Sequence, residues 1–96
     1  MVWHTVWFKL IDNVTESDKQ AMLQSLRALP QHVDGIEELA CGEDFCGRAQ
    51  GFQIGLVVKF ASRTALEEYG PHPVHQKFVS GFKHLWADVM ALDFDG

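Results

Sequence analysis

The sequence predicts an α+β fold of the ferredoxin-like type, in which a β-α-β-β-α-β unit forms one antiparallel sheet with helices on one face. Its 96 residues correspond to one small domain, covering residues 1–96. Four segments have the composition of strands, and amphipathic helical segments separate the first from the second and the third from the fourth. Crossovers of this kind are right-handed, and the ferredoxin-like arrangement satisfies that rule.

The first strand is expected over residues 2–11, where side chains alternate between two faces. One face holds His4, Val6, Phe8 and Leu10, and the other holds Trp3, Thr5, Trp7 and Lys9. Because both faces carry large apolar groups, we expect both sides of this strand to be covered.

The first helix is expected to begin after Thr15, which stands three residues before Asp18 as in a capping box. The apolar residues Met22, Leu23, Leu26 and Leu29 then follow at helical spacing. This pattern predicts an amphipathic helix of about 14 residues, ended by Pro30.

The remaining elements are expected in the following order along the chain. After a turn at 33–35 come a strand over 36–41, a glycine-rich loop over 42–51, a strand over 52–60, helices over 62–69 and 74–83, and a last strand over 85–94. The nearly continuous apolar run of 52–60 indicates a central position in the sheet.

Four strands with helices on one face leave the other sheet face bare. The chain is 47% hydrophobic, and a domain of this size buries only about 60–65% of its unfolded surface. We therefore expect a second copy to cover the bare face, which makes the protein a homodimer.

The charge pattern argues against two classes of partner. The net charge is −5, and the eight basic residues are scattered singly, so we expect neither nucleic-acid binding nor a membrane-surface role. No apolar run is long enough to span a membrane, and the start of the chain is typical of a strand rather than a signal peptide. Two cysteines are too few for a disulfide scaffold, so a cytoplasmic location is expected.

The segment from Tyr69 to His75, YGPHPVH, holds the candidate chemistry. Histidine can act as a base or an acid near neutral pH, and tyrosine is a good donor to an oxyanion. Tyr69 and His75 therefore form a sensible catalytic pair if the turn folds back. Alternatively, His75 only caps a helix or hydrogen-bonds a backbone carbonyl. For His72, between two prolines, a role in fixing the turn is favoured.

A zinc site and a redox role are both disfavoured. Cys41 and Cys46 together with His72 and His75 would supply a Cys2His2 set, but the histidine spacing is shorter than usual. We therefore predict no metal and no cofactor. The cysteines are expected to be core or loop-edge thiols.

Three stretches together resemble a known family: the opening VWHTVWFKL, the block GLVVKFASRTALEEYGPHPVH and the closing LWADVMALDFD. The chain resembles the stress-responsive dimeric α/β-barrel (Dabb) domain family along nearly its whole length. The resemblance implies a ferredoxin-like subunit whose sheet meets that of its twin to close a barrel. One plant branch of the family contains polyketide cyclases, which perform an intramolecular aldol condensation without a cofactor.

The resemblance also implies site residues. The catalytic tyrosine and histidine of the cyclases correspond to Tyr69 and His75, and the histidine of their first strand corresponds to His4. A further pocket histidine falls at Ile54, and aromatic pocket residues of the first helix fall at Met22 and Leu26. These three departures imply a pocket of different shape from that of the cyclases.

Three functional hypotheses follow. The first is binding of a small apolar or aromatic molecule between sheet and helices, with cyclase or lyase chemistry at His75 and Tyr69. Its substrate-binding residues would be His4, Val6, Phe8, Met22, Leu26, Leu56 and Phe78. The second is a non-catalytic, stress-associated or structural homodimer whose pocket is filled by side chains. The third is a cofactor-free monooxygenase of similar fold.

Overall fold

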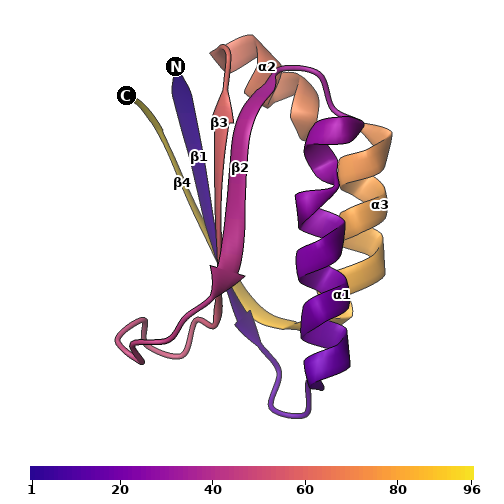
Figure 1. The fold of residues 1–96 in the computed structure, drawn as a ribbon, viewed down its shortest axis with the longest axis vertical. Coiled ribbons are helices and arrows are strands. Elements are labelled where there is room, and N and C mark those ends of the chain that lie inside the picture. Colours follow the sequence, from indigo (N-terminus) through magenta and orange to yellow (C-terminus); the bar gives the residue numbers. More distant parts are fainter.

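A computed structural model describes all 96 residues and has the predicted order of elements (Figure 1). The elements are β1 (Val2–Leu10), α1 (Glu16–Arg27), β2 (Ile36–Glu43), β3 (Ile54–Phe60), α2 (Arg63–Tyr69), α3 (Pro73–Phe82) and β4 (Trp86–Asp95). The predicted ferredoxin-like α+β fold is confirmed. No helix is long and apolar enough to cross a membrane.

The four strands form one antiparallel sheet in the order β2-β3-β1-β4. The central position expected for the third strand is therefore confirmed. Val6 of β1 pairs with Leu56 of β3 and with Ala91 of β4, which sets the register on both sides. The N- and C-termini consequently lie side by side at one end of the sheet (Figure 1).

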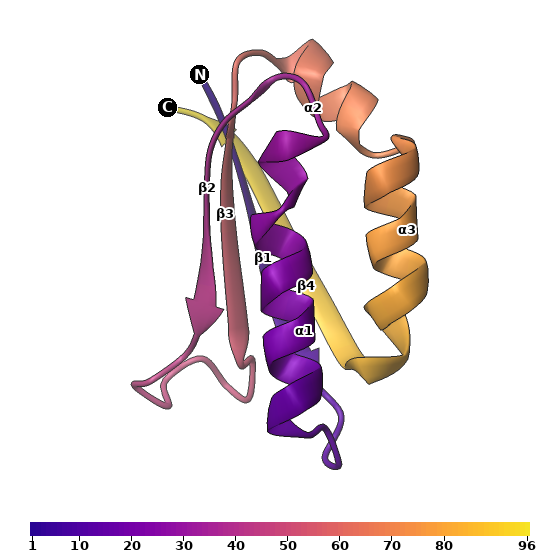
Figure 2. The ribbon, with the colours of Figure 1, turned by 45° about the vertical axis from the view of Figure 1, so that its right-hand side comes forward.

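The helices cover one face of the sheet, and the core lies between the two layers. Figure 2 shows α1 and α3 on the same side of the sheet, with α2 at the end nearest the termini. The core cluster consists of Val2, Val6, Phe8, Leu10, Met22, Leu23, Leu26, Leu29, Val33, Ile54, Leu56, Val58, Phe60, Tyr69 and Phe78. Alternate residues of β1 and β3 therefore face the helices, as the alternation predicted.

The predicted capping box of α1 is present, but the predicted end of the helix is wrong. The Thr15 hydroxyl accepts a hydrogen bond from the Asp18 amide, and the Asp18 carboxylate accepts one from the Thr15 amide. The helix ends at Arg27, and Pro30 lies inside a following 3-10 turn, Leu29–Gln31. Proline is tolerated in the first turn of such a helix because its missing N–H would have no partner there.

The strands on either side of the glycine-rich loop also differ from expectation. β2 continues to Glu43, beyond the predicted end at Cys41, and β3 begins at Ile54 rather than at Phe52. Gly42 pairs with Gly55 in this extension. Pairing with a neighbouring strand outweighs the weak strand preference of glycine, which the sequence pattern alone could not reveal.

The predicted start of the last strand, and the face assigned to its first residues, are wrong. Leu85 lies in a 3-10 turn, Lys83–Leu85, and the strand begins at Trp86. A register shift between Lys9 and Leu10 turns Trp86 toward the core, where its ring centroid is 4.8 Å from that of Phe8. The alternation had placed Trp86 on the same face as Met90, but this bulge moves it to the opposite face.

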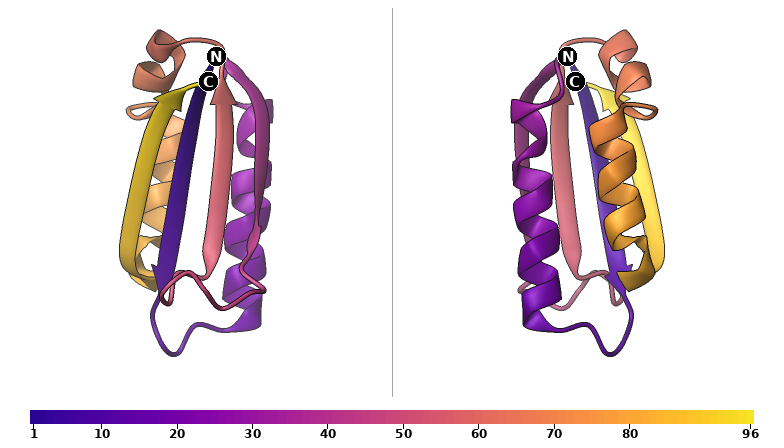
Figure 3. Two further views of the ribbon diagram at one scale, coloured as in Figure 1. Left: turned by 90° about the vertical axis from the view of Figure 1, so that its left-hand side faces the viewer. Right: turned by 90° about the vertical axis from the view of Figure 1, so that its right-hand side faces the viewer.

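The second face of the sheet has no covering layer (Figure 3, left). Large apolar side chains remain exposed on it: Trp7, Val57, Met90, Leu92 and Phe94. Trp7 is 49% exposed and Leu92 is 64% exposed. We call this surface the open face.

Candidate acid–base site

The structure brings three of the predicted site residues together. The ring centroids of Tyr69 and His75 are 4.2 Å apart, and those of His4 and Tyr69 are 5.8 Å apart. Phe60 packs behind them, with its ring centroid 5.2 Å from that of Tyr69. We call His4, Tyr69 and His75 the ring cluster.

The loop between α2 and α3 produces this proximity. α2 begins at the Ser62 cap, whose hydroxyl accepts a hydrogen bond from the Ala65 amide, and ends at Tyr69. α3 starts at Pro73, with Nδ1 of His72 accepting a hydrogen bond from the Val74 amide at 3.1 Å. The expected turn-fixing role of His72 is confirmed: it caps α3, because its ring satisfies an amide of the first turn.

His75 makes the hydrogen bond to a backbone carbonyl that the non-catalytic alternative expected, and this bond also defines which ring nitrogen can accept a proton. Nδ1 of His75 lies 2.8 Å from the carbonyl oxygen of Gly70, which also accepts a hydrogen bond from the side chain of Gln76. A carbonyl oxygen can only accept, so Nδ1 carries the proton. In the neutral ring Nε2 then holds the free lone pair and is the atom that can serve as a base.

Tyr69 is the most deeply buried member of the ring cluster, at 3% exposure. Burial raises the pKa of its hydroxyl to about 12, because the phenolate would be poorly solvated there. At neutral pH Tyr69 is therefore a protonated donor, suited to stabilise negative charge on a neighbouring oxygen.

His4 is held by a residue that sequence reasoning did not assign to the site. Its Nδ1 donates a hydrogen bond to the carboxylate of Asp93, which is its direct cross-strand partner on β4. A hollow of about 230 Å³ between α2 and the end of β4 has Asp93 in its wall, along with Arg63 and Asp95. The only signal in the sequence was the closing DFD, because strand register is not visible in a single sequence.

The other proposed substrate-binding residues lie in the core. Met22 and Leu26 are fully buried, and Leu56, Phe8, Phe78 and Val6 are buried as well. Phe8 and Phe78 pack edge to face, with ring centroids 6.4 Å apart. The space between sheet and helices is therefore occupied by side chains, and a ligand could enter this space only if the helices moved away from the sheet.

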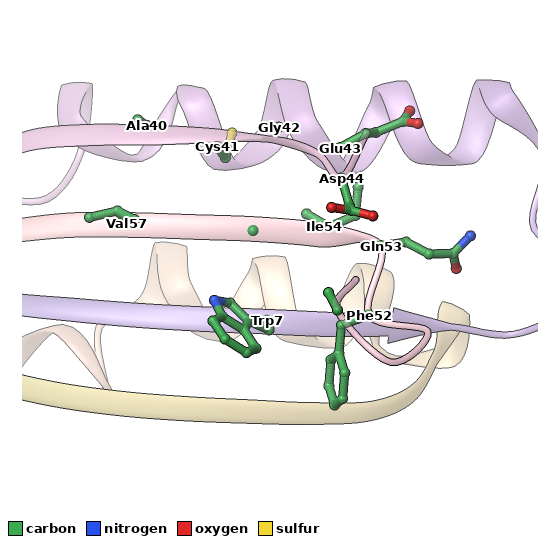
Figure 4. Close-up of a pocket in the computed structure, with 12 residues that line it drawn as sticks. Trp7, Ala40, Cys41, Gly42, Glu43, Asp44, Phe52, Gln53, Ile54 and Val57 are labelled. Carbon is green, nitrogen blue, oxygen red and sulfur yellow. The ribbon is translucent and has the colours of Figure 1, made fainter. Parts of the chain in front are cut away.

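A separate hollow of about 450 Å³ lies on the open face (Figure 4). Trp7 and Phe52 form one wall, with ring centroids 6.4 Å apart. Gly42 and Gly55 leave its floor bare, since nothing lies within 4 Å of a Cβ added at either position. The exposed Phe45 belongs to the loop beside this hollow and is 96% exposed.

The cysteines and histidines do not assemble into a metal site. No group of three or more histidine, cysteine, aspartate or glutamate side chains is arranged to hold an ion. Cys41 and Cys46 are free thiols. Burial raises the pKa of the Cys41 thiol, although Arg27 partly opposes this.

The chain matches the family model of the stress-responsive A/B barrel domain (Dabb) over residues 2–95. Olivetolic acid cyclase of Cannabis sativa is 22% identical over 95 residues, covering 97% of this chain and 94% of that protein. Among solved structures, a dimeric ferredoxin-like protein of Thermobifida fusca has a TM-score of 0.88 at 22% identity, covering 99% of this chain and 90% of that one. Hydroxynitrile lyase of Passiflora edulis has a TM-score of 0.87 at 18% identity, covering 97% and 90%. The chain belongs to the stress-responsive A/B barrel domain family.

Proposed function

We propose that this protein acts on a small apolar or aromatic molecule by cofactor-independent acid–base chemistry, with His75 as the base and Tyr69 as the hydrogen-bond donor. The observation that carries the proposal is the bond from Nδ1 of His75 to the Gly70 carbonyl, which leaves Nε2 free beside a protonated Tyr69. The relatives named as a cyclase and a hydroxynitrile lyase support a reaction of this class.

Both reactions make or break a carbon–carbon bond next to an oxygen. In an aldol cyclisation, Nε2 of His75 removes a proton beside one carbonyl, and the resulting electron pair attacks a second carbonyl carbon. The oxygen that becomes negative accepts a hydrogen bond from Tyr69 and then takes the proton back from His75. In the lyase direction, Nε2 removes the hydroxyl proton, the bond to the cyano carbon breaks, and cyanide leaves and takes up the proton.

The substrate would approach through the hollow between α2 and β4, whose wall contains the hydrogen-bond partner of His4. His4 would then contact it at the inner end, while the buried residues Val6, Phe8, Met22, Leu26, Leu56 and Phe78 would form the apolar wall. Access to that wall requires α2 and α3 to shift, and lid-like motion of this kind is common in enzymes.

We also propose that the working form is a homodimer joined through the open face, which would cover Trp7, Met90 and Leu92. The solved relative from Thermobifida fusca is described as dimeric. Two free cysteines suit a reducing compartment, so we propose the cytoplasm.

A non-catalytic homodimer is the second candidate, and the filled core favours it. Met22, Leu26 and Phe78 occupy the space that a ligand would need. In this case the ring cluster would contribute only packing and hydrogen bonds.

One assay separates the two candidates. Purified protein is incubated with mandelonitrile, and benzaldehyde release is followed. In parallel it is given a linear triketide thioester, and ring closure is followed. The first candidate predicts that one substrate is converted faster than in buffer and that His75→Asn abolishes the excess rate. Equal rates with wild type, His75→Asn and buffer would favour the structural dimer.

A further inference from the structure

A groove on the outer surface of the helix layer has the properties of a second ligand site. It lies between α1 and α3, has a volume of about 480 Å³, and is separate from the hollow that reaches Asp93. Its volume is within the range of about 300–1,000 Å³ found for small-molecule sites. Figure 3 (right) shows α1 and α3 side by side on the face turned away from the open face.

The floor of this α1–α3 groove is apolar. Leu29, Val74, Phe78 and Phe82 line it, and the rings of Phe78 and Phe82 pack together with centroids 5.4 Å apart. Gly81 also lines the groove, and a Cβ added there would meet nothing within 4 Å. The glycine therefore leaves open space where any other residue would place a side chain above the floor.

The rim of the groove carries hydrogen-bond donors and no carboxylate. Ser25, His32 and Lys77 are its polar residues. The ion pairs of the structure join Lys19 to Glu16 and Glu43, and Arg63 to Asp95, while His4 is bonded to Asp93, so neither Lys77 nor His32 is paired. Lys77 therefore has no carboxylate of this chain competing for its charge within the groove.

Two carbonyl groups that follow α1 at this rim are occupied by the 3-10 turn. The carbonyl oxygen of Ala28 accepts a hydrogen bond from the Gln31 amide, and that of Leu29 accepts from the amides of His32 and Val33. Helix C-termini usually repel anions because their carbonyls are unsatisfied. Here the 3-10 turn occupies the carbonyls of Ala28 and Leu29, so these two residues of the groove add no free acceptor beside Lys77.

We propose that the α1–α3 groove binds an amphipathic organic monoanion, with its carboxylate at Lys77 and His32 and its apolar body on Phe78 and Phe82. A carboxylate matches these donors, and an alkyl or aryl body matches the floor. The site does not depend on the proposed chemistry of the ring cluster, and a protein inactive in that chemistry would still have it.

The test uses octanoate as the probe, followed by NMR amide shifts of the whole protein. Saturable shifts are expected at Val74, Lys77 and Gly81, and octanamide, the uncharged analogue, should bind more weakly. Lys77→Gln should weaken octanoate binding about fivefold, as expected for one exposed charge contact. Lys83→Gln, on the turn after α3 and outside the groove, is the matched control and should bind as wild type does.

Filling the groove provides the second test. Gly81→Leu places a side chain into open space without a backbone clash, so the fold should be retained and octanoate binding lost. The proposal is overturned if binding survives Gly81→Leu, if octanamide binds as tightly as octanoate, or if no saturable shifts occur. Shifts confined to Tyr69 and His75 would also overturn it, and they would support the ring cluster as the binding site instead.

Discussion

The imidazole of His75 lies against the phenol of Tyr69, with ring centroids 4.2 Å apart and the ring planes tilted by 45°. The two residues come from different helices, and the turn between them holds both rings at the same end of the core. His75 is oriented by the Gly70 carbonyl, whereas Tyr69 is oriented by burial. The roles that we propose for them rest on this difference.

Tyr69→Phe removes the hydroxyl group, so wild type and variant should differ in how their free energy of unfolding depends on pH. Burial raises the pKa of Tyr69 to about 12, from an ordinary value of 10.0. Between these values the unfolded chain loses the phenolic proton while the folded chain keeps it, so the free energy of unfolding falls as pH rises. Between pH 8 and pH 11 the fall in the free energy of unfolding should therefore be about 1 kcal/mol larger for wild type than for Tyr69→Phe. Urea unfolding of both proteins at both pH values measures this, and parallel losses would contradict the deep burial of the hydroxyl.

His72 should behave as a helix cap. His72→Ala removes the acceptor for the Val74 amide and should lower the free energy of unfolding by about 0.5–2 kcal/mol. His72→Asp supplies another cap acceptor and should restore most of that stability. Thermal melts of the three proteins test the prediction, which fails if the alanine variant is as stable as wild type.

Replacing glycine by alanine should change the free energy of unfolding in opposite directions at two positions. Gly81 lies in α3 with open space around it, so Gly81→Ala should raise the free energy of unfolding by about 0.5–1 kcal/mol. Gly35 has φ of +91°, and a Cβ there would lie 2.7 Å from the Cβ of Ala65, so Gly35→Ala should be destabilising. Denaturant titration ranks the two variants. A more stable Gly35→Ala protein would show that the turn before β2 is wrongly described.

The open face should determine the oligomeric state. Leu92→Lys puts a charge in the middle of the exposed apolar surface, so a homodimer joined there should dissociate to monomers. Val89→Lys is the control, since Val89 pairs with Phe8, whose side chain faces the helices, and is 42% exposed. Light scattering after size exclusion gives the mass of each. A Leu92→Lys protein that remains dimeric would place the interface elsewhere.

The order of elements could be predicted because each has its own local signal. The Thr15 capping box, the alternation of β1 and the Gly-Pro stop after Tyr69 are local, and all three agree with the structure. The end of α1 was wrong for a local reason, because Pro30 fits a 3-10 turn. The end of β2 and the starts of β3 and β4 were wrong because they depend on contacts distant in sequence. Gly42 is held in β2 by Gly55, and the bulge opposite Leu10 rotates Trp86.

The candidate site was predictable in part for the same reason. Tyr69 and His75 are close in sequence, so a rigid turn was enough to suggest that they meet. The pairing of His4 with Asp93 depends on the register of β1 and β4, which a single sequence does not specify. Nor could the sequence tell whether Met22 and Leu26 line a pocket or fill it, since both uses require the same apolar residue types.

The division of roles between His75 and Tyr69 is tested most directly by His75→Asn. The asparagine amide can replace Nδ1 in the bond to the Gly70 carbonyl, but it offers no counterpart of Nε2. The measurement is the turnover of the substrate that wild type converts, together with the melting temperature of both proteins. It decides whether His75 is the base. We predict that turnover is lost while the melting temperature changes by less than about 4 °C, equivalent to under 1 kcal/mol for a domain of this size. Retained turnover, or a collapse of stability with the hydrogen bond still possible, would contradict a base at His75.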